Sequence, residues 1–356
     1  MPYVLGLVNA ALKSGVETYA VNFVLKATQS DPVTGSKVAK ELISADEVDL
    51  VMTSSTPETI NPVADACEAG AMPCLSTVAP WEDAYIGRGA KPGAPSPFTR
   101  TYYHFSFGAS DFAAVYIDQW SKITTNKKVG VLLPSDADGN AIRAVMIPAL
   151  QKAGFTVTDA GPYENGITDF SAQISTFLDA GVEIVNSFPI PPDFPFFRRQ
   201  AAQKGLAQQV KIMQVAKAGL FEVEMEAMGD LGNAVASGAY WHRAYPFVSP
   251  VTGKKCDELA DGFEKATGKP WSQQVGAQMA LFDPAIGALK ASRNPKDKAS
   301  VAEAFSKLKV ETAAGLVGTQ WLKKDGGKFP FTLDVTSNVL VPKVPITAPL
   351  KPFELG

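Results

Sequence analysis

The chain has 356 residues, a length that corresponds to two or three domains and excludes a single small module. Its 46% hydrophobic and 19% charged residues are ordinary for a globular protein and exclude intrinsic disorder. The 33 Lys and Arg residues against 36 Asp and Glu residues give a net charge of −3, so we expect no nucleic-acid partner. Two histidines, and three cysteines without metal-ligand spacing, predict no metal site.

The chain begins with an apolar segment, residues 1–12, that lacks the basic flank and the cleavage sequence of a secretion signal. The spacing of its apolar residues predicts a helix, so we expect that any secretion signal has been removed or was never present. Residues 19–25 alternate in polarity and predict a strand. A polar turn then leads to a helix that carries Val38 and Leu42 on one face.

A strand–helix–strand unit follows. Residues 48–52 form an apolar run typical of a buried strand, and Thr56 before Pro57 is a helix-start signal. A short strand at 73–76 completes a βαβ unit, which requires a parallel sheet. Glycines and prolines predict a long loop at 78–101. The aromatic run 102–107 alternates as a strand does, so one set of rings would be buried and the other would face a cleft.

The pattern then restarts as a second α/β array, separate from the first. We expect its strands at 128–133, 155–159, 183–188, 210–215 and 234–241, and its helices at 140–153, 169–180 and 194–204. Three further helices are predicted at 256–267, 272–292 and 301–308. The last forty residues, with a strand-like run at 331–335, would return across the sheets.

Motifs for catalysis are scarce. There is no GxSxG sequence, no phosphate-binding loop and no GxGxxG after a strand, which lowers the prior for an enzyme and predicts no nucleotide cofactor. In open α/β sheets, ligands bind at the carboxyl ends of the strands, where helix N-termini present unpaired N–H groups. Three loops meet this condition, at 53–56, 76–81 and 135–139.

The first two loops predict a ligand site. Ser54 and Ser55 follow a buried strand and precede a helix, so they could receive a carboxylate; alternatively, Thr56 only caps that helix. Ser76 and Thr77 end the neighbouring strand. Trp81 offers a flat face to a ring or an alkyl chain, or else packs structurally.

The second array could add an acidic and a basic group to the same cleft. Asp136 and Asp138 flank the turn before Gly139, and Lys217 follows the strand that ends at Val215. The alternative is that these are solvated loop charges.

Two of the cysteines could be bonded. Cys67 lies on a predicted helix and Cys74 on the next strand, close enough for a disulfide if their Cβ atoms face each other, or they are two buried thiols. Cys256 would then be unpaired, and a bridge would imply an oxidising compartment.

Several segments together resemble a known family. The runs TQSDP (28–32), VDLVMTSSTPET (48–59), MPCLSTVAPW (72–81) and KKVGVLLPSDADGNA (127–141) are similar to those of type I periplasmic substrate-binding proteins of ABC importers. The similar branch includes leucine/isoleucine/valine-binding proteins. The runs at 165–185 and 198–206 match that family's second lobe, and the resemblance covers residues 19 to about 310.

The resemblance implies an α/β fold of two doubly wound, Rossmann-like lobes with a ligand cleft between them. Lobe 1 would comprise 1–106 and 242–318, and lobe 2 would comprise 107–241 and 319–356. The family opens with a strand that this chain lacks, since the sequence begins within the first helix, so we expect an unpaired strand edge.

The resemblance also implies a function without catalysis. Hinge closure on a small carboxylate-bearing ligand, an amino acid or an aromatic acid, would precede delivery to membrane permease subunits, with a monomeric, periplasmic protein. A ligand-sensing receptor domain and an α/β enzyme are the alternatives.

Ligand contacts carry over to Ser54, Ser55, Ser76 and Thr77, with a further position at Phe188 and one near Lys217. Asp138 stands where the family often has an aromatic residue. Together with Trp81, this departure favours an aromatic or otherwise flat carboxylate.

Overall fold

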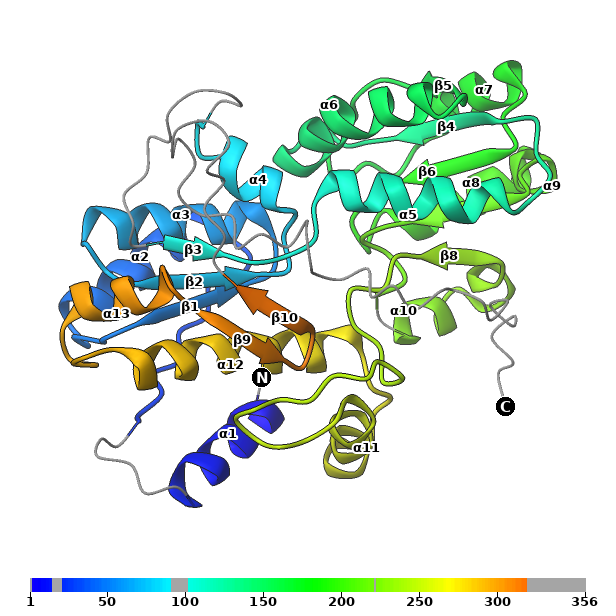
Figure 1. The fold of residues 1–356 in the computed structure, drawn as a ribbon. Helices are drawn as coiled ribbons and strands as arrows, with labels where there is room; N and C mark the ends of the chain where they lie inside the picture. Colours follow the sequence, from blue (N-terminus) through cyan, green and yellow to red (C-terminus); the bar gives the residue numbers. More distant parts are fainter. Residues whose placement is uncertain (1, 15–20, 91–101, 221, 319–356) are drawn as a thin grey trace. The chain divides into compact units, whose positions relative to one another are not determined.

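The computed structural model describes residues 2–14, 21–90, 102–220 and 222–318 (Figure 1). Two compact units divide the chain. Unit 1 contains the described residues up to Gly108 and from Tyr240 onward, and unit 2 contains Ala109–Ala239. Both have parallel sheets covered by helices, which confirms the predicted α/β class. The lobe boundaries predicted after 106 and 241 remain a proposal, and residues 319–356 lie outside the described part of the chain.

Unit 1 is built from two segments of the chain. Its strands are β1 (Val51–Ser54), β2 (Cys74–Thr77), β3 (Tyr102–His104), β9 (Lys309–Thr312) and β10 (Gly315–Gly318). Its helices are α1 (Pro2–Ser14), α2 (Pro32–Ser44), α3 (Pro57–Ala69), α4 (Trp81–Ile86), α11 (Cys256–Thr267), α12 (Gln273–Ala291) and α13 (Lys298–Phe305). The strands β1, β2 and β3 form a parallel sheet in this order, and β9 and β10 form an antiparallel hairpin.

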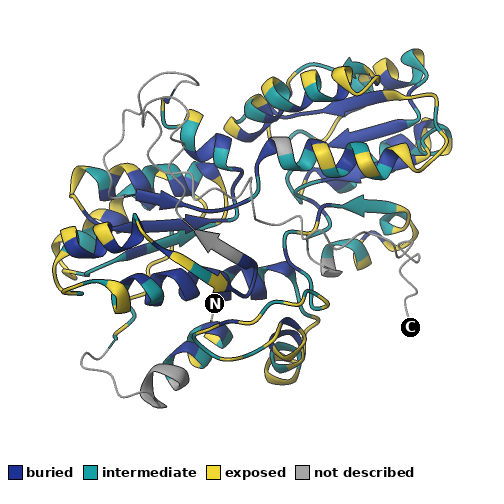
Figure 2. Cartoon of the chain, in the orientation of Figure 1, coloured by how far each residue is buried: buried dark blue, intermediate teal, exposed yellow. Residues whose placement is uncertain are grey.

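Helices cover both faces of the β1–β2–β3 sheet. Because side chains alternate along a strand, Cys74 and Tyr102 join a core cluster with α2 and α3, whereas Leu75 and Tyr103 join a cluster with α12 and α13. In Figure 2 the strands β2 and β3 are buried, while the outer surfaces of the helices are exposed. Unit 1 is therefore a three-layer α/β/α structure.

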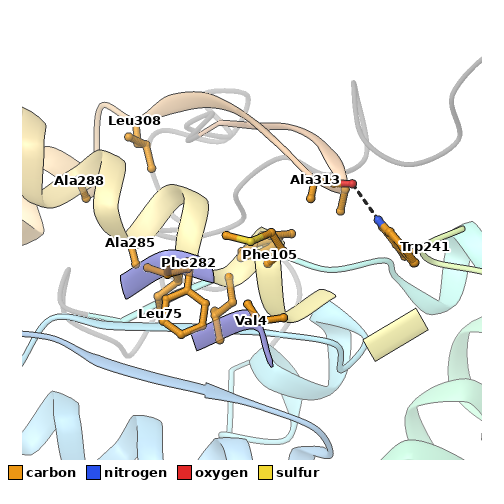
Figure 3. Close-up of a cluster of buried hydrophobic side chains, with 14 of the residues drawn as sticks. Val4, Leu75, Phe105, Trp241, Phe282, Ala285, Ala288, Leu308 and Ala313 are labelled. Carbon is orange, nitrogen blue, oxygen red and sulfur yellow. Dashed lines mark hydrogen bonds between the residues drawn. The ribbon is translucent and has the colours of Figure 1, made fainter. Parts of the chain in front are cut away.

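The larger core cluster of unit 1 joins both of its chain segments. Figure 3 shows Leu75 and Phe105 from the first segment beside Phe282 of α12. The Trp241 indole is fully buried and donates a hydrogen bond of 3.0 Å to the Ala313 carbonyl in the β9–β10 turn. The sheet and the hairpin are thus held by residues far apart in sequence.

A buried carboxylate connects three parts of this region. Asp283 of α12 accepts hydrogen bonds from the Ser249 hydroxyl (2.6 Å), the Ala313 amide (2.9 Å) and the Val251 amide (3.4 Å). Burial raises the pKa of Asp283 to about 7, although these three donors act in the opposite direction. The helix, the loop and the hairpin turn therefore meet at one titratable group.

The described part of unit 2 is one continuous segment. Its strands are β4 (Lys128–Leu132), β5 (Thr156–Asp159), β6 (Ile184–Ser187), β7 (Ile212–Val215) and β8 (Val235–Ser237). Its helices are α5 (Ala109–Ser121), α6 (Ala137–Lys152), α7 (Ser171–Ala180), α8 (Phe194–Gln203), α9 (Leu206–Gln209) and α10 (Glu222–Glu226), with a 3₁₀ turn η1 (Gly229–Gly232). The parallel sheet has the order β5-β4-β6-β7-β8. Val131 and Ile184 face the core formed with α5 and α6, and Leu132 and Val185 face the core formed with α7 and α8.

Three local predictions from the sequence are wrong. Residues 21–25 form no strand: in the described part of the chain β1 is hydrogen-bonded only to β2, and no strand pairs with its other edge. The predicted loop 78–101 contains α4, whose first turn has the acidic residues Glu82 and Asp83 that favour a helix N-terminus. The aromatic strand exposes no set of rings, because parallel sheets are covered on both faces.

Aromatic rings contact the backbone where the chain leaves unit 1 and returns to it. The rings of Phe107 and Tyr240 stack with centroids 5.5 Å apart. Gly108 lies against the Trp81 indole, and a Cβ atom at Gly108 would be only 2.4 Å from Nε1. Both connections therefore begin from packed, aromatic parts of unit 1.

Candidate functional site

Two adjacent strands of unit 1 end in turns with unusual backbone geometry. Ser54 of β1 pairs in register with Thr77 of β2. The next residues, Ser55 and Val78, have φ values of 123° and 82°. Positive φ is costly for a residue with a side chain, and most costly for a β-branched one such as Val78. Strained turns of this kind concentrate at binding sites, and here two lie side by side at the carboxyl edge of the sheet.

The N-terminus of α3 lies in the first of these turns. Thr56 occupies the N-cap position, but its side chain makes no capping hydrogen bond to the described backbone. Ser55 and Thr56 are exposed, and Ser54 is partly exposed. The structure therefore does not show the capping role considered for Thr56, and the positive end of the helix can receive an anion.

Ser76 lies in a buried hydrogen-bond network instead. Its hydroxyl oxygen is 2.6 Å from the Tyr102 hydroxyl and 2.7 Å from Nδ1 of His104, whose Nε2 is 2.9 Å from the Ala79 carbonyl. Burial lowers the pKa of His104 to about 4, so the ring is neutral at pH 7. Because a carbonyl only accepts, Nε2 donates to Ala79; Ser76 then donates to Nδ1, and Tyr102 donates to Ser76. This geometry favours a structural role for the Ser76 hydroxyl, and its ligand contact remains a prediction.

Trp81 begins α4 directly after the second strained turn. Its backbone amide donates to the Phe107 carbonyl at 3.1 Å, and its ring is partly buried. The indole Nε1 is buried without a hydrogen-bond partner among the described residues. One edge of the indole ring packs against Gly108, so a ligand could contact only the remaining surface of the ring.

Unit 2 brings Asp138 and Lys217 together at the carboxyl edge of its sheet. The Lys217 ammonium lies 2.8 Å from an Asp138 oxygen and 3.1 Å from an Asp136 oxygen. All three side chains are mostly buried, so they are not the solvated loop charges considered as the alternative. Asp136 is also the N-cap of α6, where it accepts the Gly139 amide at 2.7 Å, and it accepts Nδ2 of Asn165 at 2.8 Å.

The remaining predicted residues are buried. Phe188 is 2% exposed and belongs to the core cluster of unit 2 beside α5 and α6. Cys67 and Cys74 are buried and unbonded, as is Cys256. A hydrogen bond with Cys67, and secondly burial, raise the pKa of the Cys74 thiol. The ligand contact at Phe188 and the Cys67–Cys74 bridge stay predictions.

The sequence analysis missed several residues at these edges. Nothing in the sequence indicates the positive φ of Val78, since valine is disfavoured there. Asn165 was absent from the candidates although it bonds to Asp136, because its loop lies in a different part of the chain. Glu82 and Asp83 are almost fully buried in the first turn of α4, and their acidic character before a helical run could have located that turn.

The described residues meet the requirements of neither a metal centre nor a membrane-spanning helix. Within residues 2–14, 21–90, 102–220 and 222–318, no group of three or more His, Cys, Asp or Glu side chains is arranged to hold a metal ion. In the same part of the chain, no helix has the length and apolar character needed to cross a bilayer.

Comparison with known proteins identifies the family. A family model described as "Periplasmic binding protein" matches residues 3–328. No curated protein sequence matches the chain. Among solved structures, a leucine-binding protein LivK from Thermotoga maritima is 15% identical, with a TM-score of 0.73 over 89% of this chain and 86% of that one.

Two other solved structures contain ligands. A solute-binding protein of an ABC transporter from R. palustris, in complex with 4-hydroxybenzoate, is 17% identical, with a TM-score of 0.71 over 90% of this chain and 84% of that one. The branched-chain amino acid transporter substrate-binding protein LivJ from Streptococcus pneumoniae, in complex with isoleucine, is 13% identical, with a TM-score of 0.70 over 91% and 87%. At these identities the neighbours establish the fold, and the family model, which spans both α/β units, shows that the chain belongs to the periplasmic binding protein family.

Proposed function

We propose that this protein is an extracytoplasmic solute-binding protein that captures a small carboxylate-bearing ligand and delivers it to the permease of an ABC importer. The observation that carries the proposal is the family match across both α/β units. Members of this family bind solutes without transforming them, so we propose no catalysis. We further propose that the protein acts in the periplasm as a monomer.

The carboxyl edge of unit 1 supports a carboxylate as the anchored group. The exposed turn after β1 combines the Ser54 and Ser55 hydroxyls with an N-terminus of α3 that the Thr56 side chain does not cap. Thr77 stands opposite Ser54 in the parallel register. Hydroxyl and amide donors near a helix N-terminus are suited to a single negative charge. The ligands in the R. palustris and S. pneumoniae structures, 4-hydroxybenzoate and isoleucine, both contain a carboxylate.

A thermal-shift screen against amino acids and aromatic acids tests the proposal. A ligand at 100 times its Kd stabilises the folded state by about 2.7 kcal/mol, which is readily measured. We expect a selective rise in melting temperature with one compound class. A protein that melts cooperatively but responds to no amino acid and no aromatic acid would overturn the proposed ligand class.

A double substitution then tests the anchoring residues. Ser54→Ala with Thr77→Ala removes two hydrogen bonds of about 0.5–1.5 kcal/mol each, which should weaken ligand binding roughly 5- to 150-fold. Ser44→Ala is the matched control, because its hydroxyl bonds only to the Lys40 carbonyl on the exposed surface of α2. Unchanged affinity in the double variant would move the site away from these turns.

A further inference from the structure

Lys217 is the only basic side chain predicted for the ligand site, and carboxylates of the protein already neutralise it. Two carboxylates, from Asp136 and Asp138, lie within 3.1 Å of the Lys217 ammonium. Burial alone would lower the pKa of Lys217, but the two carboxylates outweigh burial and raise it, so the side chain stays charged. Two negative charges against one positive charge leave the cluster at −1.

The nearby helix N-terminus offers no anion site either. The α6 helix begins at Ala137, and the Asp136 carboxylate accepts the Gly139 amide of its first turn at 2.7 Å. A carboxylate of the protein therefore occupies the position in which a helix N-terminus would hold a ligand anion. At this edge of unit 2, the Lys217 ammonium and the N-terminus of α6 could each bind an anion, but both already bind carboxylates of the protein.

A buried hydroxyl close to the cluster points to a polar occupant. Tyr163 is 5% exposed, and its hydroxyl is buried without a hydrogen-bond partner among the described residues. Burial raises its pKa first, and the charges of Asp193 and Asp136 raise it further, so both carboxylates are near the ring. A buried O–H without an acceptor is rare in folded proteins, so the Tyr163 hydroxyl is a donor that no described residue uses. Asp193 itself is 2% exposed and accepts the Gly166 amide at 2.8 Å.

We infer that the carboxyl edge of the unit 2 sheet accepts an uncharged or cationic hydrogen-bond donor of the ligand and rejects a second anion, with Asp138 as a specificity-determining residue. This inference rests on the proposed function and narrows its ligand to a monocarboxylate with a donor group, such as a hydroxyl, an amide or an ammonium group. Dicarboxylates and phosphorylated acids are excluded, because a further negative charge would face the carboxylates of Asp136 and Asp138 against the single ammonium of Lys217.

Pairs of probes that differ mainly in charge test the inference. On an aromatic scaffold the pair is 4-hydroxybenzoate and terephthalate, and on an amino-acid scaffold it is glutamine and glutamate. Affinities are measured by calorimetry for the unsubstituted protein and for Asp138→Asn, which keeps the shape of the side chain and removes one negative charge. Asp118→Asn is the matched control, since Asp118 forms an exposed ion pair with Lys122 on α5.

If the protein binds the aromatic pair, we expect 4-hydroxybenzoate to bind at least about tenfold more tightly than terephthalate. If it binds the amino-acid pair, we expect the same preference for glutamine over glutamate. Asp138→Asn should reduce that ratio by about tenfold or more, whereas Asp118→Asn should leave it unchanged. Equal or tighter binding of terephthalate or glutamate would overturn the inference, and so would a ratio that Asp138→Asn does not change. Either result would leave the proposed function standing. Failure of all four probes and of the wider amino-acid and aromatic-acid screen would overturn the proposed function, and the inference with it.

Discussion

The buried network around Ser76 makes a sharp prediction about stability. Replacing Ser76 with Ala removes the hydroxyl that accepts from Tyr102 and donates to His104. All three residues are almost fully buried, so no bulk water can replace the lost partner. The Tyr102 O–H and Nδ1 of His104 would both be left unsatisfied.

The expected cost follows from these two orphaned groups. Each buried polar group without a partner costs about 1–3 kcal/mol, so Ser76→Ala should lower the free energy of unfolding by about 2–6 kcal/mol. For a unit of roughly 200 residues, each kcal/mol corresponds to about 2–4 °C, which predicts a fall in melting temperature of about 4–24 °C. Adding Tyr102→Phe removes one orphaned group and should therefore recover part of the loss.

Scanning calorimetry of the unliganded protein measures these changes. The matched control is Ser44→Ala, which removes an exposed hydroxyl that bonds within its own helix and should change stability by less than about 0.5 kcal/mol. If Ser76→Ala has the melting temperature of the unsubstituted protein, the substitution does not leave the Tyr102 hydroxyl and Nδ1 of His104 unsatisfied, and the reasoning is refuted. A double variant less stable than Ser76→Ala alone would also refute the reasoning.

Three further predictions concern other buried groups. The folded protein keeps the proton of Asp283 up to about pH 7, while the unfolded chain releases it near pH 4, so this contribution to stability falls as pH rises between these values. Asp283→Asn should therefore destabilise less at pH 8 than at pH 5, by roughly 3 kcal/mol in urea unfolding, and a pH-independent difference would contradict the assignment. Thiol titration of denatured, unreduced protein tests the bridge predicted from the sequence: three free thiols, as in the structure, would exclude it, whereas a count of one would show that two of the three cysteines are bonded. Gly108→Ala should lower the melting temperature through an overpacking cost of about 1–3 kcal/mol against Trp81, and no change would show that the indole moves aside freely.

Much of the fold can be predicted from local sequence signals. Thr56 followed by Pro57 predicts the start of α3, and apolar periodicity predicts α11 with the bounds that the structure shows. Such signals act within a few residues and need no tertiary information. The prediction at 21–25 failed because strand formation depends on a neighbouring strand, which local polarity does not report. The α5 helix was missed although Ala113, Tyr116 and Trp120 follow helical spacing.

The candidate site is less predictable, because its properties depend on long-range contacts. Local pattern placed Ser54, Thr77 and Lys217 at the carboxyl ends of strands, as the structure does. It could not distinguish the exposed Ser54 turn from the buried Ser76 hydroxyl, because the partners of Ser76 come from β3. It also could not show that Lys217 is neutralised, since Asp136 is 81 residues away in the sequence.

The discontinuity of unit 1 has a consequence for synthesis. The described part of unit 2 is one continuous segment, so all of that part is available once Ala239 has been made. The helices α12 and α13, which cover one face of the β1–β2–β3 sheet, are synthesised much later than the sheet. The Tyr103 hydroxyl, for example, donates to the Ala302 carbonyl, 199 residues later in the chain. Until α12 and α13 are made, the apolar face formed by Leu75, Tyr103 and Phe105 lacks the layer that these two helices supply. The nascent chain should therefore expose an apolar, aggregation-prone surface for most of its elongation, and holdase chaperones would bind that surface.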